Sequence, residues 1–109
     1  MTGDLRDALA AIDGVIEAPS RYKESLAYWV NGKEIAHFES ASELDIRLTR
    51  AVIAAHRPSL RADPAVHLRP STSDWITVDT RDRALVIHLV ELAAAAHRAP
   101  PGWIADPPG

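Results

Sequence analysis

An Asn-Gly pair at positions 31 and 32 constrains the fold of this chain more than any other feature. The flanking segments, residues 22–30 and 33–40, show the alternation of side chains that is typical of β-strands. Asn and Gly both tolerate the positive φ angles of a type I′ turn, whose twist matches that of two paired strands. The sequence therefore predicts a β-hairpin over residues 22–40 with a two-residue loop.

The register of this hairpin follows from the turn if pairing continues without interruption. The predicted cross-strand pairs are Val30–Lys33, Trp29–Glu34, Tyr28–Ile35 and Leu26–His37. Because successive side chains point to opposite faces, the more apolar face carries Leu26, Tyr28, Val30, Ile35 and His37. The other face carries Ala27, Trp29, Glu34, Ala36 and Phe38. We expect the first face to be the core face, which places a titratable histidine among apolar side chains.

The remaining patterns predict further strands and helices in a definite order. A first helix is expected over residues 3–12, and a last one over residues 81–98 with Asp79 or Thr80 as cap. A middle helix is expected from Thr49 as N-cap to about His56, before the breaker Pro58, with a brief continuation of the pattern to Leu60 as the alternative. Strands are expected over residues 44–48, 65–69 and 74–80, and residues 15–21 are expected to be a connection. Runs of adjacent strands favour an α+β fold, an antiparallel sheet of about five strands with helices on one face.

Length and composition place this fold in a single domain. The chain has 109 residues and no cysteine, so disulfides, thiolate metal sites and thiol catalysis are excluded. We expect residues 1–98 to form the domain and the proline-rich residues 99–109 to form a flexible tail, with Trp103 and Ile104 as its apolar anchors. No apolar run reaches the roughly 20 residues of a membrane span, and the acidic N-terminus argues against a secretory signal. A cytoplasmic location without a membrane partner is predicted.

The charge balance argues against a nucleic-acid partner. The chain has 12 basic and 15 acidic residues and a net charge of −3, whereas nucleic-acid binders usually carry a basic patch. Asp45 and Asp63 dilute the arginines that come nearest to a cluster, which are Arg47, Arg50, Arg57, Arg61 and Arg69.

Few residues form a pattern typical of a catalytic or metal site. None of the five histidines has the spacing of the HExxH metal motif. His37 and Glu39 lie two apart on one strand face and could both reach a metal, although a hydrogen-bonded core histidine is the commoner case; no metal and no cofactor is predicted. The hydroxyls of residues 71–73 are explained by a turn. A candidate ligand pocket combines Tyr28, His37, Trp75 and His88, with His37 as the candidate catalytic residue.

Three blocks of the sequence resemble the small bacterial proteins called luciferase family proteins, a domain that also occurs in fungal luciferases. The matching residues are Gly32, Glu34, Ile35 and His37 in the first block, Ser73, Asp74, Trp75 and Ile76 in the second, and Asp82 with the following helix in the third. The family commonly has a second histidine and a glycine after the first, where this chain has Phe38, Glu39 and Ser40. The fungal relatives imply an oxygenase that acts on a polyphenolic pyrone without metal or flavin.

Three functions follow as hypotheses. The first is a ligand-binding or accessory domain without catalysis, with a small aromatic ligand near His37 and Trp75. The second is a cofactor-independent oxygenase in which His37 acts as general base. The third, from a looser resemblance to MmcQ/YjbR-like double-wing proteins, is nucleic-acid binding. The oligomeric state is not predicted.

Overall fold

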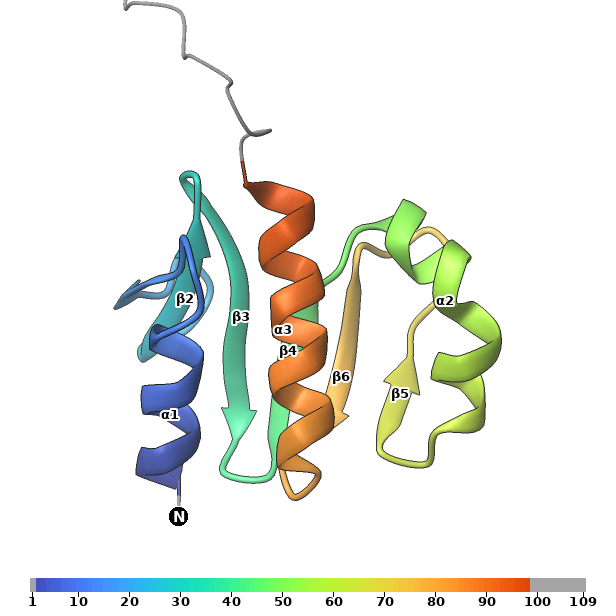
Figure 1. The fold of residues 1–109 in the computed structure, drawn as a ribbon, viewed down its shortest axis with the longest axis horizontal. Coiled ribbons are helices and arrows are strands. Elements are labelled where there is room, and N and C mark those ends of the chain that lie inside the picture. Colours follow the sequence, from blue (N-terminus) through green and yellow to red (C-terminus); the bar gives the residue numbers. More distant parts are fainter. Residues whose placement is uncertain (1, 99–109) are drawn as a thin grey trace, which may run out of the picture.

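A six-stranded sheet with the strand order β1-β2-β3-β4-β6-β5 organises the computed structural model, which describes residues 2–98 (Figure 1). Every neighbouring pair of strands is antiparallel. The strands are β1 (Ile16–Pro19), β2 (Leu26–Val30), β3 (Lys33–Ser40), β4 (Glu43–Arg47), β5 (Val66–Leu68) and β6 (Trp75–Asp79). The helices are α1 (Thr2–Ala10), α2 (Arg50–Ala62) and α3 (Arg83–His97). The predicted α+β architecture is confirmed, with six strands rather than about five.

The additional strand is β1, in the segment that was predicted to be a connection. Ile16 pairs with Trp29 and Pro19 pairs with Leu26, so β1 extends the hairpin at one edge of the sheet. An edge strand tolerates Pro19 because a proline lacks only the backbone N–H that the outer side does not use. The sequence does not predict β1, because the strand is short and contains a proline. The predicted tail, residues 99–109 with Trp103 and Ile104, lies outside the described residues.

The helices cover one face of the sheet. Figure 1 shows α3 lying across β3 and β4 with α1 beside it, and both helices make the corresponding contacts. α2 packs against the outer strand β5. Among residues 2–98, none of the helices combines the length and the apolar character needed to cross a bilayer.

Helix boundaries differ from the predictions at the end of α2 and at the start of α3, and α1 ends at Ala10 rather than at residue 12. Thr49 caps α2 as expected, because its Oγ1 accepts from Val52 N, but α2 continues through Pro58 to Ala62. Pro58 and the preceding turn at Ala54 are exposed, so the carbonyl that loses its partner can bond to water instead. α3 begins at Arg83 because Asp82, rather than Asp79 or Thr80, accepts a hydrogen bond from Leu85 N.

The covered face of the sheet is the apolar core. One cross-strand row runs through Tyr28, Ala36, Ile46 and Ile76, all fully buried. The adjacent row, on the opposite face of the sheet, runs through Ala27, His37, Asp45, Thr77 and His67. The register of the strands therefore puts apolar side chains under the helices and a line of polar side chains on the side away from them.

The hairpin register is wrong beyond its first two pairs. Val30–Lys33 and Trp29–Glu34 form as predicted, around a turn in which Asn31 and Gly32 have positive φ angles. A β-bulge then adds one residue to β3, so that Tyr28 pairs with Ala36 and Ala27 with His37. The predicted Tyr28–Ile35 and Leu26–His37 pairs do not form. Because one extra residue exchanges the two faces of a strand, the bulge turns His37 away from the apolar face.

Candidate functional site

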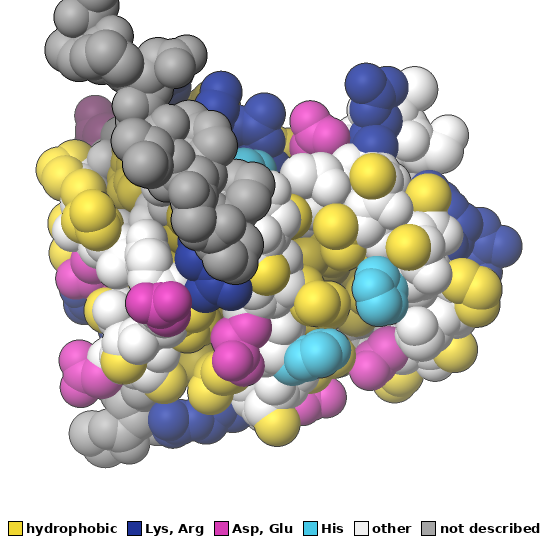
Figure 2. Space-filling model, turned by 45° about the horizontal axis from the view of Figure 1, so that its top comes forward, with side chains coloured by type: hydrophobic (Ala, Val, Ile, Leu, Met, Phe, Trp, Pro, Cys, Tyr) yellow, Lys and Arg dark blue, Asp and Glu magenta, His cyan; other side chains and the backbone are white. Residues whose placement is uncertain are grey.

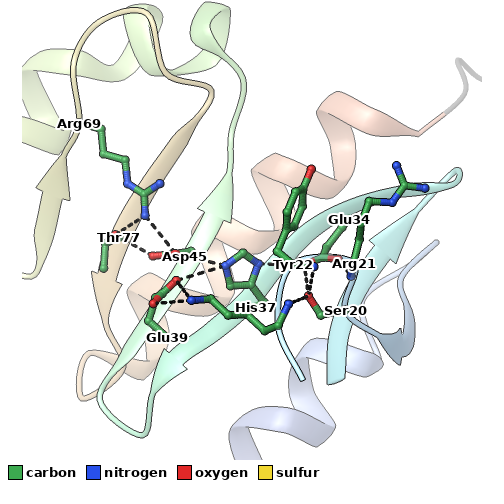
Figure 3. A network of polar contacts seen from close by, with 10 residues as sticks. Ser20, Arg21, Tyr22, Glu34, His37, Glu39, Asp45, Arg69 and Thr77 are labelled. Atoms are coloured by element: carbon green, nitrogen blue, oxygen red, sulfur yellow. Dashed lines mark hydrogen bonds and ion pairs between the residues drawn. The ribbon is translucent and has the colours of Figure 1, made fainter. Parts of the chain in front are cut away.

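His37 is the centre of a polar network on the open face of the sheet, the face that the helices leave free (Figure 3). Its Nδ1 lies 2.9 Å from Glu34 Oε2, and its Nε2 lies 3.2 Å from Asp45 Oδ2. Glu39 Oε1 is 3.5 Å from the same Nε2. Glu34, His37 and Asp45 are 3%, 5% and 2% exposed, and they are the buried charged residues of the described chain. The side chains of the network are thus buried, although no helix covers this face of the sheet.

The loop between β1 and β2, residues 20–25, encloses this network and is called the covering loop below. Ser20 Oγ donates to Glu34 Oε2, and Arg21 N donates to the other carboxylate oxygen, both at 2.6 Å. Tyr22 N and Lys23 N each donate to Ser20 Oγ at 3.0 Å, which folds the loop back over the sheet. Glu34 therefore ties the covering loop to the imidazole.

The far side of the network is held by residues of β4, β6 and the segment before it. Thr77 Oγ1 donates to Asp45 Oδ1 at 2.7 Å, and an Arg69 guanidinium nitrogen lies 3.0 Å from Asp45 Oδ2. Burial alone raises the pKa of Asp45, but hydrogen bonds with Glu39 and Thr77 and the charge of Arg69 outweigh it and hold that pKa below its ordinary value. Lys23 Nζ lies 3.1 Å from the Glu39 carboxylate. Asp45 is thus a stable anion at neutral pH.

Two aromatic rings flank the imidazole at the mouth of a cavity of about 330 Å³. The Trp75 ring centre lies 5.1 Å from the His37 ring centre, and the Tyr22 ring centre lies 6.0 Å from it. Tyr22 and Trp75 meet edge to face at 6.0 Å. Lys23 and Arg69 also line the cavity. The cavity therefore offers aromatic surface, two cations and the carboxylates of the network.

A family model described as the luciferase domain matches residues 32–96, more than half of the 109 residues. The chain belongs to the luciferase-domain family. The match spans the elements from β3 to α3, which supply His37, Asp45 and Trp75, whereas the covering loop precedes it. No curated protein and no solved structure gives a significant match. The looser resemblance to MmcQ/YjbR-like proteins is not shown.

This luciferase domain brings together two of the four residues of the predicted pocket. His37 and Trp75 are in contact on the open face. Tyr28 points to the other face, where its ring lies 6.4 Å from that of Phe38, and His88 is exposed on α3. The sheet therefore separates Tyr28 and His88 from His37. The cause is the bulge in β3, which the prediction of an uninterrupted hairpin did not include.

Sequence analysis did not predict the roles of Glu34, Asp45 and Tyr22. The alternation in residues 44–48 already puts Asp45 on the face opposite its apolar neighbours, so its place on the open face could have been predicted. Glu34 precedes His37 by three residues, a spacing that puts two side chains on opposite faces of a regular strand. Tyr22 lies in the covering loop, where no regular spacing predicts the direction of a side chain.

The two carboxylate contacts of His37 need more donors than a neutral imidazole has. A neutral imidazole has one N–H donor and one lone pair. Here both ring nitrogens face carboxylate oxygens, Nδ1 facing Glu34 and Nε2 facing Asp45. Either a second proton or a metal ion must therefore bridge one of the two contacts. A role as general base also requires Nε2 to leave Asp45.

Surface charge is mixed on one side of the molecule. On the side of the molecule shown in Figure 2, basic, acidic and apolar side chains are interspersed rather than grouped by sign. Nucleic-acid binding usually depends on a continuous basic surface. The interior network, with its cavity, is therefore a stronger candidate for a functional site than this charged surface.

Proposed function

We propose that the open face binds a small planar aromatic molecule and that the protein is a ligand-binding or accessory domain of the luciferase family. The observation that carries this proposal is the pair of rings, Tyr22 and Trp75, placed edge to face beside His37 at the cavity mouth. Aromatic rings favour offset or edge-to-face contacts with one another. A third ring from a ligand can add to this cluster.

The other groups of the cavity favour polar substituents on the ligand. Lys23 and Arg69 can donate hydrogen bonds to hydroxyl, carbonyl or phenolate oxygens, while Glu39 can accept one from a hydroxyl. The cavity volume of about 330 Å³ falls at the small end of the range for small-molecule sites, which is roughly 300–1,000 Å³. A phenolic compound of one or two rings fits both the size and the chemistry. Membership of the luciferase-domain family also supports a ligand of this class.

Protein NMR with a panel of polyhydroxylated aromatic compounds tests the proposal. The expected result is that a bound compound shifts the indole N–H signal of Trp75 and the backbone signals of the covering loop. We expect Trp75→Ala and Tyr22→Ala each to weaken binding by about two- to tenfold, since an aromatic contact contributes roughly 0.5–1.5 kcal/mol.

Tyr28→Phe is the matched control, because it alters an aromatic residue on the helix-covered face. It should bind as the unmodified protein does. An unchanged affinity in Trp75→Ala, or a loss of binding in Tyr28→Phe, would place the ligand elsewhere and refute the proposal.

A second candidate, the cofactor-independent oxygenase, stays a prediction. The contact between the His37 and Trp75 rings favours it, because a ligand stacked on Trp75 comes close to the imidazole. Oxygen consumption in the presence of a bound compound is the measurement. Unchanged consumption in His37→Gln would contradict a base role for His37, and it would leave the ligand-binding proposal standing.

A further inference from the structure

Three potential metal ligands converge at the floor of the cavity. His37 Nε2, a carboxylate oxygen of Glu39 and a carboxylate oxygen of Asp45 all lie within 4.8 Å of one another. His37 and Asp45 are buried, whereas the Glu39 side chain is 34% exposed and reaches in from the rim. Within residues 2–98, this is the group of histidine and acidic side chains close enough to share one ion.

From this convergence we infer that His37, Glu39 and Asp45 form a site for one divalent transition-metal ion. One imidazole with two carboxylates is a donor set that Zn²⁺, Mn²⁺ and Fe²⁺ all accept. The inference goes beyond the proposed function, because an ion can occupy these side chains with or without an aromatic ligand. It also departs from the expectation of a cofactor-free domain.

The distances fit the dimensions of such a site. Bonds of about 2.0–2.1 Å to a tetrahedral ion place neighbouring ligand atoms about 3.3–3.4 Å apart. His37 Nε2 lies 3.2 Å from Asp45 Oδ2 and 3.5 Å from Glu39 Oε1. Two edges of the coordination polyhedron are therefore already close to the required length. The remaining positions of the ion face the cavity that these side chains line.

Glu34 supplies the outer contact that a metal-binding histidine needs. Such a histidine almost always donates its second N–H to a carboxylate or a carbonyl, which fixes the tautomer and aims the lone pair. Glu34 Oε2 lies 2.9 Å from Nδ1, and the position of Glu34 is set by Ser20 Oγ and Arg21 N. With Nδ1 donating to Glu34, the lone pair of Nε2 points at Asp45 and Glu39. Two carboxylates that face a lone pair favour a cation between them.

Two side-chain cations compete for these carboxylates. Lys23 Nζ lies 3.1 Å from Glu39, and an Arg69 nitrogen lies 3.0 Å from Asp45. Their side chains are 41% and 40% exposed, so both can turn toward solvent when an ion binds. The outer oxygen of Asp45 keeps its bond from Thr77 in either case. Removing the Lys23 charge should therefore strengthen ion binding, an effect opposite to that of removing a ligand.

Isothermal titration with Zn²⁺, and the visible absorption of bound Co²⁺, test the inference on tag-free, chelator-treated protein. The expected result is one ion per chain with a Co²⁺ spectrum of low coordination number. Glu39→Gln should weaken binding at least tenfold, as even outer-contact changes typically cost about 10–100-fold. His37→Gln should abolish it, and Lys23→Gln should tighten it several-fold.

Glu43→Gln is the matched control, since it removes an exposed carboxylate from the same strand as Asp45 without touching the cluster. It should bind Zn²⁺ as the unmodified chain does. Absence of 1:1 binding by the unmodified chain, or equal losses in Glu39→Gln and Glu43→Gln, would overturn the inference. Melting curves of each variant separate a lost site from a lost fold. Repeating the aromatic titration in chelator shows whether the two sites fail together or separately.

Discussion

The two faces of the sheet bury different kinds of side chain in this protein. The row Tyr28–Ala36–Ile46–Ile76 is apolar, fully buried and covered by helices. On the other face, Asp45 and its neighbour His37 are also buried, yet they are charged or polar and lie beneath the covering loop, Trp75 and Arg69 instead of helices.

This contrast distinguishes the face that stabilises the fold from the face that holds the candidate site. Apolar burial under α3 gains free energy in proportion to area and needs no particular partner. Burial of His37, Glu34 and Asp45 costs desolvation, which is offset only when every group finds its partner. The network and the cavity beside it make this face the candidate binding face. The predictions below test whether the faces are independent.

The largest effect is expected on the covered face. Ile46→Ala should lower the free energy of unfolding by about 2–5 kcal/mol, because it removes buried methylene groups from the middle of the core and leaves a cavity. Urea denaturation measures the change. Glu43→Ala, at the exposed end of the same strand, should stay within about 0.5 kcal/mol of the unmodified chain. Similar losses for both would contradict the assignment of this face as the core.

Alkaline pH should destabilise the covered face through Tyr28. Burial, assisted by the nearby Glu17 carboxylate, raises the pKa of the Tyr28 hydroxyl to about 12. The unfolded value is near 10, so the stabilisation is complete below pH 10 and is lost as pH rises to about 12. The loss amounts to roughly 2–3 kcal/mol, measured by urea denaturation between pH 9 and 12.

Tyr28→Phe removes this pH dependence. Among the described residues the hydroxyl makes no hydrogen bond of good geometry, although Glu17 and Arg6 lie near enough to affect its pKa, so its removal should change stability at pH 7 by about 1 kcal/mol or less. At pH 11.5 the variant should be the more stable protein. Tyr22→Phe, at an exposed ring on the other face, serves as the control. A Tyr28→Phe variant that still loses stability between pH 10 and 12 would disprove this cause.

On the open face, the expected loss is smaller and local. Glu34→Gln removes the charge that joins the covering loop to His37 and should lower stability by about 1–3 kcal/mol. The loop contains Arg21 and Lys23, so trypsin cleavage within it should accelerate roughly tenfold as the loop opens. Glu43→Gln provides the comparison at equal charge. If cleavage rates match in the two variants, Glu34 does not hold the loop.

Much of the fold could be predicted because local chemistry decides it. The turn at Asn31 and Gly32, the cap at Thr49 and the alternation over residues 44–48 each specify one element without help from the rest of the chain. β1 could not be predicted in the same way, since a four-residue edge strand ending in Pro19 depends on the neighbour that it pairs with.

The candidate site depends on the β-bulge in β3, which the sequence does not predict. Pairing from the turn outward correctly gives Trp29–Glu34, and then the bulge moves His37 from Leu26 to Ala27. That single residue brings His37 to the same face as Glu34 and Asp45 and removes it from Tyr28. A bulge arises from how the completed sheet packs, with Ile35 buried in the core, and not from the residues at the bulge alone. His37 and Trp75 are in contact nevertheless, although the predicted position of His37 on the apolar face is wrong.

The smallest effect is expected at the turn, which belongs to neither face. Gly32 has a φ of +77°, and a Cβ there would meet nothing within 4 Å, so Gly32→Ala is strained only through its backbone. The expected cost is about 1 kcal/mol, whereas Asn31→Gly should be close to neutral. Because the strain does not reach the network, the NMR signals of the His37 ring should stay where they are in the unmodified chain. A shift of those signals as large as that in Glu34→Gln would mean that the turn and the site are coupled, and that the hairpin transmits strain to the open face.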